Sequence, residues 1–304
     1  MLSKSFESEL IRRIRKLNAP LAPLPSKIAP RIEPIGGLKA VLFDVYGTLL
    51  VSGAGKHSGD NRASQTAALR KALAAVGGHR CAPAAREGFR LFNAMLSAGH
   101  AGLKRSGIRH PEVDILAVWQ GILAELRSRA LINFKATAPM AARVAVEYEN
   151  RINPVWPMPG AAGILAELSA RGFLLGIVSN AQFYTNLTLS ALFGSRWKRW
   201  FHPELCFWSH EYGQAKPGRF LFRRAAREFK KIRAARPREV IMIGNDFEND
   251  VLPALGCGFR AVLFAGDRRS CRPGQNPRRA PKACLTITNW RQLLEIVGPE
   301  PHRQ

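Results

Sequence analysis

The hydrophobic positions of this chain fall into two patterns, short uninterrupted runs and longer stretches at helical spacing. Uninterrupted apolar runs predict strands that are buried on both faces of a sheet. Such runs occupy residues 40–43, 173–178, 205–208, 240–243 and 261–264. Residues 161–170 and 217–232 lie between them and carry apolar side chains at helical spacing. Strands that alternate with helices predict an α/β fold around a parallel sheet with right-handed crossovers.

Residues 60–150 interrupt this alternation, because their pattern is helical throughout. We expect four helices there, marked by apolar stripes, by prolines suited to a first turn and by glycines suited to an end. Their expected ranges are Asp60 or Asn61 to Gly77, Phe89 to Leu96, Pro111 to Leu126, and Pro139 to Tyr148. Four helices without a strand between them predict a separate helical unit, residues 53–155, inserted into a core of residues 37–52 and 156–304. Residues 53–59 and 153–160 are the expected hinges.

The first 36 residues form a basic, proline-rich arm. Phe6, Leu10, Ile14 and Leu17 recur at helical spacing, which predicts a short amphipathic helix before Pro20. Prolines between residues 20 and 34 prevent further helix, so this part is expected to be extended. We expect the arm to pack on the main domain, with partner binding as the alternative.

The charge of the chain is strongly positive. Among 304 residues, 46 Lys and Arg stand against 22 Asp and Glu, which gives a net charge of +24. Such a charge attracts anionic partners, including nucleic acids and phosphorylated small molecules. Aromatic and basic residues do not interleave into a nucleic-acid module, so our interpretation favours arginines scattered over solvated faces. We expect a small anionic substrate; nucleic acid is compatible with the charge but is not favoured.

The sequence predicts neither a membrane span nor a signal peptide. Apolar runs fall short of the roughly 18 residues of a span, and Arg12, Arg13 and Arg15 interrupt the first apolar residues. The five cysteines include no Cys-x-x-Cys pair, which argues against a disulfide framework or a zinc site. A cytoplasmic location without a membrane partner is the expectation, and the oligomeric state is left open.

Polar residues follow the predicted strands at the edge where an open α/β sheet binds its ligands. Asp44 follows the first strand, Ser179 and Asn180 the second, and Asp246 and Asp250 the fourth. A carboxylate is an effective nucleophile when the attacked centre is held and its charge is neutralised, so Asp44 is the candidate nucleophile. Asp246 and Asp250 supply hard oxygen ligands that, with Asp44, suit Mg²⁺. Helix capping is the alternative for each of these two acids.

Lys216 and two hydroxyl residues complete the candidate catalytic set. Lys216 supplies a positive charge that offsets charge developing on a substrate, or it is a surface lysine at a helix start. Ser179 and the N–H groups beyond it suit an anionic oxygen, or Ser179 caps the next helix. Thr48 either orients Asp44 through a hydrogen bond or satisfies the turn.

Taken in order, these stretches resemble the four motifs of the haloacid dehalogenase-like hydrolase superfamily over roughly residues 37–297. The motifs are Phe43-Asp44-Val45-Tyr46-Gly47-Thr48-Leu49, Ser179-Asn180, Lys216-Pro217, and Gly244-Asn245-Asp246 through Asp250. The resemblance implies a Rossmann-like parallel core with an inserted all-helical cap of the first type. It also implies that Asp44 becomes covalently attached to the substrate, that Tyr46 and Asn180 bind substrate, and that Asp44, Tyr46, Asp246 and Asp250 hold Mg²⁺.

The motifs disagree about the reaction. Phosphatase members carry a second Asp where this chain has Tyr46, whereas Tyr is typical of the dehalogenases. Other dehalogenase signatures are replaced by Phe222, Asn245 and Phe247, and their cap arginine has only Arg70 and Arg80 as candidates.

The spacing of the fourth motif is also ambiguous. One alignment places Asn245 where the first metal-binding Asp belongs, and a shift of one residue places Asp246 there. The two retained acids favour Mg²⁺, and Mg²⁺ favours phosphoryl chemistry. We therefore expect Mg²⁺-dependent hydrolysis of a phosphate monoester through Asp44. Carbon–halogen hydrolysis without metal is the alternative reaction, and a non-catalytic binding or scaffold protein with a basic surface is the alternative outside the enzymes.

Overall fold

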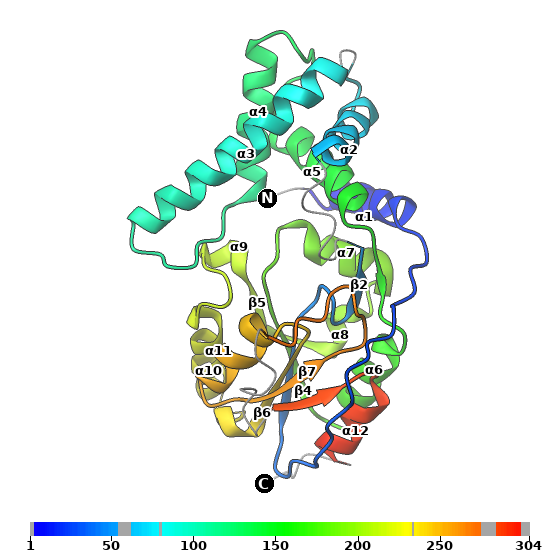
Figure 1. Cartoon of the computed structure of the whole chain (residues 1–304), viewed down its shortest axis with the longest axis vertical. Coiled ribbons are helices and arrows are strands. Elements are labelled where there is room, and N and C mark those ends of the chain that lie inside the picture. Colours follow the sequence, from blue (N-terminus) through cyan, green and yellow to red (C-terminus); the bar gives the residue numbers. More distant parts are fainter. Residues whose placement is uncertain (1–2, 54–61, 79–80, 233, 275–283, 299–304) are drawn as a thin grey trace.

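The computed structural model describes residues 3–53, 62–78, 81–232, 234–274 and 284–298. Its core is a six-stranded sheet in which every neighbouring pair is parallel. In spatial order the strands are β5 (Phe201–Trp208), β4 (Leu174–Ser179), β1 (Ala40–Phe43), β6 (Val240–Gly244), β7 (Arg260–Phe264) and β8 (Cys284–Ile287). The expected α/β, Rossmann-like parallel fold is confirmed (Figure 1). The sequence pattern indicated the first five of these strands but not the edge strand β8.

Helices cover both faces of the sheet. Val41 and Phe43 face an apolar cluster that includes α6 (Ala161–Ala170) and α12 (Arg291–Val297). Ala40 and Leu42 face a second cluster, to which α10 (Phe220–Lys231) contributes. Because side chains alternate between the faces of a strand, cover on both sides leaves all four residues of β1 buried. The connections also contain α7 (Tyr184–Phe193), α8 (Trp197–Trp200), α9 (Ser209–Tyr212), η1 (Pro237–Glu239), η2 (Phe247–Val251) and α11 (Leu252–Leu255).

The helical unit contains α2 (Arg62–Ala75), α3 (Cys81–Arg105), α4 (Ile115–Ser128) and α5 (Ala138–Ile152), with no strand between them in the described residues. α4 begins at Ile115 rather than at Pro111, because the Asp114 side chain accepts hydrogen bonds from the Leu116 and Ala117 N–H groups and caps the helix there. The expected caps of the first helix, residues 60 and 61, lie outside the described residues. None of the helices in the described ranges is long and apolar enough to cross a membrane.

A two-stranded antiparallel sheet joins the helical unit to the core. β2 (Leu50–Ser52) pairs with β3 (Val155–Pro157), and Gly53 N–H donates to the Pro154 carbonyl at 2.8 Å. The segment expected as a hinge-like linker, residues 153–160, therefore includes a paired strand. Of the other expected hinge, residues 54–59 lie outside the described residues.

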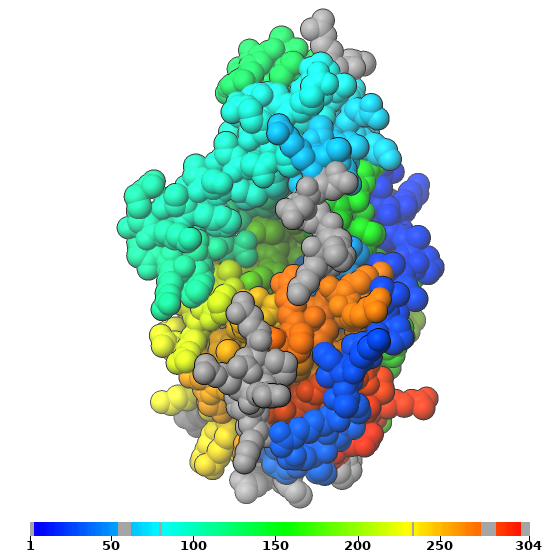
Figure 2. All heavy atoms as spheres, in the orientation of Figure 1, coloured from blue at the N-terminus to red at the C-terminus, as the bar shows by residue number. Residues whose placement is uncertain are grey.

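The N-terminal arm contacts both parts of the molecule. Its helix α1 (Lys4–Leu17) buries Leu10 and Ile14 in the apolar cluster of the helical unit. The chain then runs along the core, where Arg31 and Thr286 exchange two backbone hydrogen bonds of 2.8 and 2.9 Å. Figure 2 shows the arm in blue down one side of the molecule, from the helical unit to the core. Packing thus holds the arm along its length.

Candidate active site

Strand β1 delivers Asp44 to the carboxyl edge of the sheet. The Asp44 N–H donates to the Ile243 carbonyl of β6 at 2.9 Å, which extends the strand pairing by one residue. The chain turns immediately afterwards at Gly47, where φ is +83°. A Cβ atom at residue 47 would lie 2.6 Å from Asn245 Nδ2, so the turn and the close approach both require glycine. This turn fixes where Asp44 points.

Lys216 links the acids of two strand ends. Its Nζ donates to Asp44 Oδ1 at 2.7 Å, to Asp250 Oδ1 at 2.5 Å and to the Val178 carbonyl at 2.9 Å. Ser179 Oγ donates to the same Asp44 oxygen at 3.0 Å. Among the described residues, Asp44 Oδ2 accepts no hydrogen bond, and Asp44 lines a pocket of about 250 Å³. The arrangement therefore leaves one carboxylate oxygen available to a ligand.

Two buried carboxylates share the positive charge of Lys216. Burial lowers the pKa of Lys216, but Asp250 and Asp44 raise it, and the result is about 12. Burial raises the pKa of Asp250 to about 7, opposed by Lys216 and reinforced by the negative charge of Asp44. Lys216 is thus charged at neutral pH, whereas Asp250 holds a proton part of the time. The lysine is structurally built into the site rather than exposed at a helix start.

Asn180 and Thr48 each bond to another of the four motifs. Asn180 Oδ1 accepts from Lys216 N–H at 2.7 Å, and its Nδ2 donates to the Lys216 carbonyl at 3.0 Å. Asn180 lines the pocket, but this double contact makes it a clamp on the lysine backbone. Thr48 Oγ1 donates to Asn245 Oδ1 at 3.1 Å rather than to Asp44. Thr48 therefore anchors the turn to the fourth motif, which differs both from a hydrogen bond to Asp44 and from satisfying the turn itself.

Asp246 caps the helical turn of the fourth motif. Its Oδ1 accepts from the Glu248 and Asn249 N–H groups at 3.0 Å each. Its Oδ2 accepts from Asn249 Nδ2 at 2.8 Å and from Arg272 Nη1 at 3.3 Å. Its own N–H donates to Asp250 Oδ2 at 3.0 Å. Both carboxylates of the motif are therefore occupied by protein donors.

The carboxylates of the expected magnesium site accept hydrogen bonds from the protein. Of the carboxylate oxygens of Asp44, Asp246 and Asp250, only Asp44 Oδ2 lacks a donor within the described residues. In the described part of the chain, no group of three or more His, Cys, Asp or Glu side chains is placed to hold a metal ion. Positive charge comes instead from Lys216 and Arg272, which both line the pocket. In this arrangement protein donors engage the acids of the fourth motif, and Asp44 Oδ2 is the open oxygen among the three carboxylates in the described residues.

Tyr46 lines the pocket, and its hydroxyl bonds to a residue outside the four motifs. Its hydroxyl lies 3.1 Å from Thr185 Oγ1. Burial raises its pKa above the usual range, and the charge of Glu149 adds to this shift, so the phenol stays protonated at neutral pH. Tyr46 is thus a neutral group where the phosphatase members carry an acid.

Arg272 was not indicated by any motif in the sequence. It follows β7 in a loop, and its backbone pairs with the fourth motif: Arg272 N–H donates to the Asn245 carbonyl, and Phe247 N–H donates to the Arg272 carbonyl, both at 2.8 Å. This pairing between distant parts of the chain brings the guanidinium to the pocket. The residues next to Arg272 in the sequence therefore gave no indication of its place in the site.

Comparisons with known proteins agree with this architecture. A family model described as haloacid dehalogenase-like hydrolase matches residues 38–258. The chain is 28% identical over 114 residues to a glyceraldehyde 3-phosphate phosphatase from Methanothermobacter thermautotrophicus, an alignment that covers 35% of this chain and 44% of that protein. The chain thus matches less than half the length of this curated relative.

Solved structures share the fold at low identity. A 2-haloacid dehalogenase from Pseudomonas syringae pv. Tomato is 19% identical with a TM-score of 0.54, over 85% of this chain and 97% of that one. A HAD phosphatase from Thermococcus onnurineus is 20% identical with a TM-score of 0.50, over 87% and 100% of the two chains. The family match spans well over half of the sequence and includes Asp44, Ser179, Lys216 and Asp250. The chain therefore belongs to the haloacid dehalogenase-like hydrolases.

Proposed function

We propose that this hydrolase cleaves phosphate monoesters of small anionic metabolites, with Asp44 as the nucleophile. The observation that carries the proposal is the Asp44 carboxylate beside a pocket: Ser179 and Lys216 hold one oxygen, and no donor among the described residues contacts the other. Arg272 adds a second positive charge to the lining of this pocket. The partial similarity to a phosphatase supports the same reaction.

In the first step, Asp44 Oδ2 attacks phosphorus, a bond forms between them, and the ester P–O bond breaks. Water then attacks the phosphorus of the aspartyl phosphate, which releases inorganic phosphate and restores the carboxylate. Lys216 and Arg272 offset the charge on the transferred group, and Ser179 keeps Asp44 in place. These roles use cations of the chain itself for the charge neutralisation on which phosphoryl transfer depends.

The leaving oxygen receives its proton from water in this scheme, because the phenol of Tyr46 bonds to Thr185 and burial raises its pKa, which makes it a weak acid. A positioned general acid contributes about 10²- to 10⁴-fold to such reactions. We therefore expect the enzyme to favour esters whose leaving groups have a low pKa. The value of kcat/KM for an aryl phosphate should exceed that for an alkyl phosphate by roughly this factor.

The deciding experiment is a screen of phosphate monoesters and 2-haloacids, with Mg²⁺ and with EDTA, on the protein and on Asp44→Asn. We expect phosphate release that disappears in Asp44→Asn, whose fold is checked by circular dichroism. Since the acids of the fourth motif are already occupied, we expect most of the activity to survive EDTA. Strict Mg²⁺ dependence together with loss of activity in Asp246→Asn would instead support the metal-dependent reaction that the family resemblance implies.

Carbon–halogen hydrolysis is the second candidate, because Tyr46 is the residue typical of dehalogenases at that position. A halide leaving group needs no proton, which suits a neutral residue there. Release of halide from a 2-haloacid, without phosphate release from any ester, would replace the phosphatase proposal with this one.

A further inference from the structure

A basic groove lies on the core beside the helical unit, outside the pocket of Asp44. Its volume is about 1050 Å³. One wall comes from residues 107–110, which follow α3, and the other from residues 217–227, which lead into α10. The walls are joined by backbone hydrogen bonding, since Ala215 N–H donates to the His110 carbonyl at 2.8 Å. The groove therefore runs along the junction of the two parts of the molecule.

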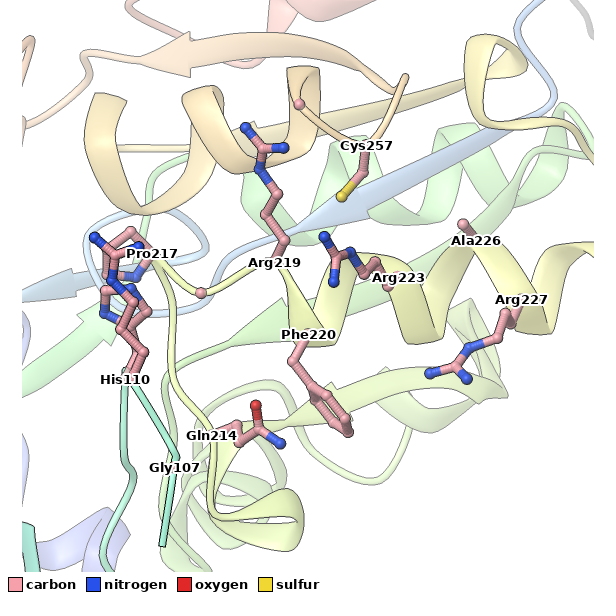
Figure 3. A pocket seen from close by; sticks show the side chains of 13 residues that line it. Gly107, His110, Gln214, Pro217, Arg219, Phe220, Arg223, Ala226, Arg227 and Cys257 are labelled. Carbon is pink, nitrogen blue, oxygen red and sulfur yellow. The ribbon is translucent and has the colours of Figure 1, made fainter. Parts of the chain in front are cut away.

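Three arginines form a stripe in this groove. Arg219, Arg223 and Arg227 are spaced four residues apart: Arg219 directly precedes α10, and the other two lie on it, with Phe220 nearby (Figure 3). Residues four apart on a helix lie on one face and are separated by roughly 6 Å along its axis, so the stripe spans roughly 12 Å. Arg219 packs closely on Gly256, because a Cβ atom there would lie 2.6 Å from the guanidinium carbon. Arg109 lines the groove from the other wall.

The positive charge of the groove is not compensated within the described residues. Arg109, Arg219, Arg223 and Arg227 are exposed, and none of them forms an ion pair in that part of the chain. Exposed arginines elsewhere, such as Arg90 and Arg129, pair with glutamates. No acidic residue lines the groove. An anionic ligand would thus meet four available guanidinium groups.

We propose that this groove binds the sugar–phosphate backbone of single-stranded nucleic acid. A single phosphate cannot contact arginines distributed over roughly 12 Å, whereas consecutive phosphates of a strand can contact each in turn. Phe220 lines the groove beside the stripe, packs against Tyr212 and is only partly buried, so it adds aromatic surface against which a base can stack. The net charge of +24 adds long-range attraction. On this proposal, four of the arginines form a localised binding surface.

The proposal concerns a site separate from Asp44, so it stands or falls independently of the proposed reaction. A labelled thymidylate strand of about 20 nucleotides is titrated with the full chain, and fluorescence anisotropy is followed over a range of salt concentrations. The test variant is Arg219→Gln with Arg223→Gln and Arg227→Gln. The control removes the same charge from exposed positions of the helical unit, as Arg70→Gln with Lys71→Gln and Arg86→Gln. Thermal unfolding verifies that both variants are folded.

Each phosphate contact contributes about 0.7 to the slope of log K against log salt for a single strand. The groove variant should therefore lower the slope by about 2 and weaken binding by about tenfold or more, and the control should retain most of both. Arg109→Gln, on the opposite wall, should lower the slope by about 0.7 and provides a milder test. Asp44→Asn should bind the strand as the unmodified chain does.

Equal weakening in the groove variant and the control would show that only the overall charge matters, which overturns the proposal. Binding of inorganic tripolyphosphate is measured as a second test, which distinguishes a small polyphosphate ligand from a nucleic-acid strand. If tripolyphosphate binds through the same arginines while the strand does not, the ligand is a small polyphosphate and the nucleic-acid assignment is wrong.

Discussion

Removing the charge of Lys216 is the sharpest test of how the site is held together. Lys216→Met keeps most of the side-chain length but removes the charge, which leaves the Asp44 and Asp250 carboxylates without their shared cation. The site is buried, since only 2% of the Lys216 side chain is exposed in the unmodified protein. Breaking a buried ion pair by removing one partner costs about 3–5 kcal/mol, mainly because the remaining charge is unpaired. We expect a loss of this size in the free energy of unfolding at about pH 8.

The loss should shrink as the pH falls. The pKa of Asp250 is already raised to about 7 by burial in the presence of Lys216, and removing the lysine raises it further. An acid whose folded pKa exceeds its unfolded pKa binds more protons in the folded state, so its destabilising effect grows as pH rises from about 4 through the folded pKa. At about pH 5.5 the carboxylate pair takes up a proton, and Lys216→Met should recover a large part of its stability.

Urea unfolding followed by circular dichroism at the two pH values measures this difference. Lys231→Met is the matched control, because Lys231 is exposed and pairs with Glu228 on the surface, so its replacement should leave the free energy of unfolding almost unchanged. Adding Asp250→Asn to Lys216→Met should restore stability at about pH 8, since it removes one of the two opposed charges. A Lys216→Met protein as stable as the unmodified one at about pH 8, or one that loses more stability in acid, would refute the reasoning.

Three further perturbations test the turn and the arm. Thr48→Val removes the donor to Asn245 and should cost about 1–3 kcal/mol by urea unfolding, whereas no measurable loss would mean that this bond does not anchor the turn. Gly47→Ala places a Cβ at φ +83° against Asn245 and should lower both stability, by about 1 kcal/mol or more, and kcat; unchanged values for both would contradict the need for glycine. Ile14→Ala opens a cavity under α1 and should lower the free energy of unfolding by about 2–5 kcal/mol, while a loss below about 1 kcal/mol would show that α1 contributes little.

Local sequence patterns predicted the elements whose signals are local. β1 occupies residues 40–43 as expected, because four apolar residues are buried on both faces of the sheet. The edge strand β8 gave no comparable signal: it is four residues long and includes a threonine. The start of α4 was misplaced because the capping bonds of Asp114 set it, rather than the preference of Pro111 for a first turn.

In the candidate site too, some features follow from local sequence patterns and others depend on tertiary packing. Parallel topology alone predicts that Asp44, Ser179 and the fourth motif meet at one sheet edge, and their hydrogen bonds join them there. Which donor reaches which oxygen depends on tertiary packing. Arg272 arrives through pairing with a loop of no recognisable motif, and its contact with Asp246 changes what that carboxylate offers to a ligand. The roles of the individual residues in a reaction remain predictions.

Helix α1 and the residue that follows it connect the helical unit to the core. The helix forms ion pairs with α5 through Arg13 and Glu147, while Arg15 donates to the Ala191 carbonyl of α7 at 3.0 Å, in the connection between β4 and β5. Asn18 then bonds to the Val155 N–H of β3 at 2.8 Å, at the joint itself. A movement of the helical unit away from the sheet would break several of these contacts of α1. Deleting α1 should therefore loosen the joint between the helical unit and the core.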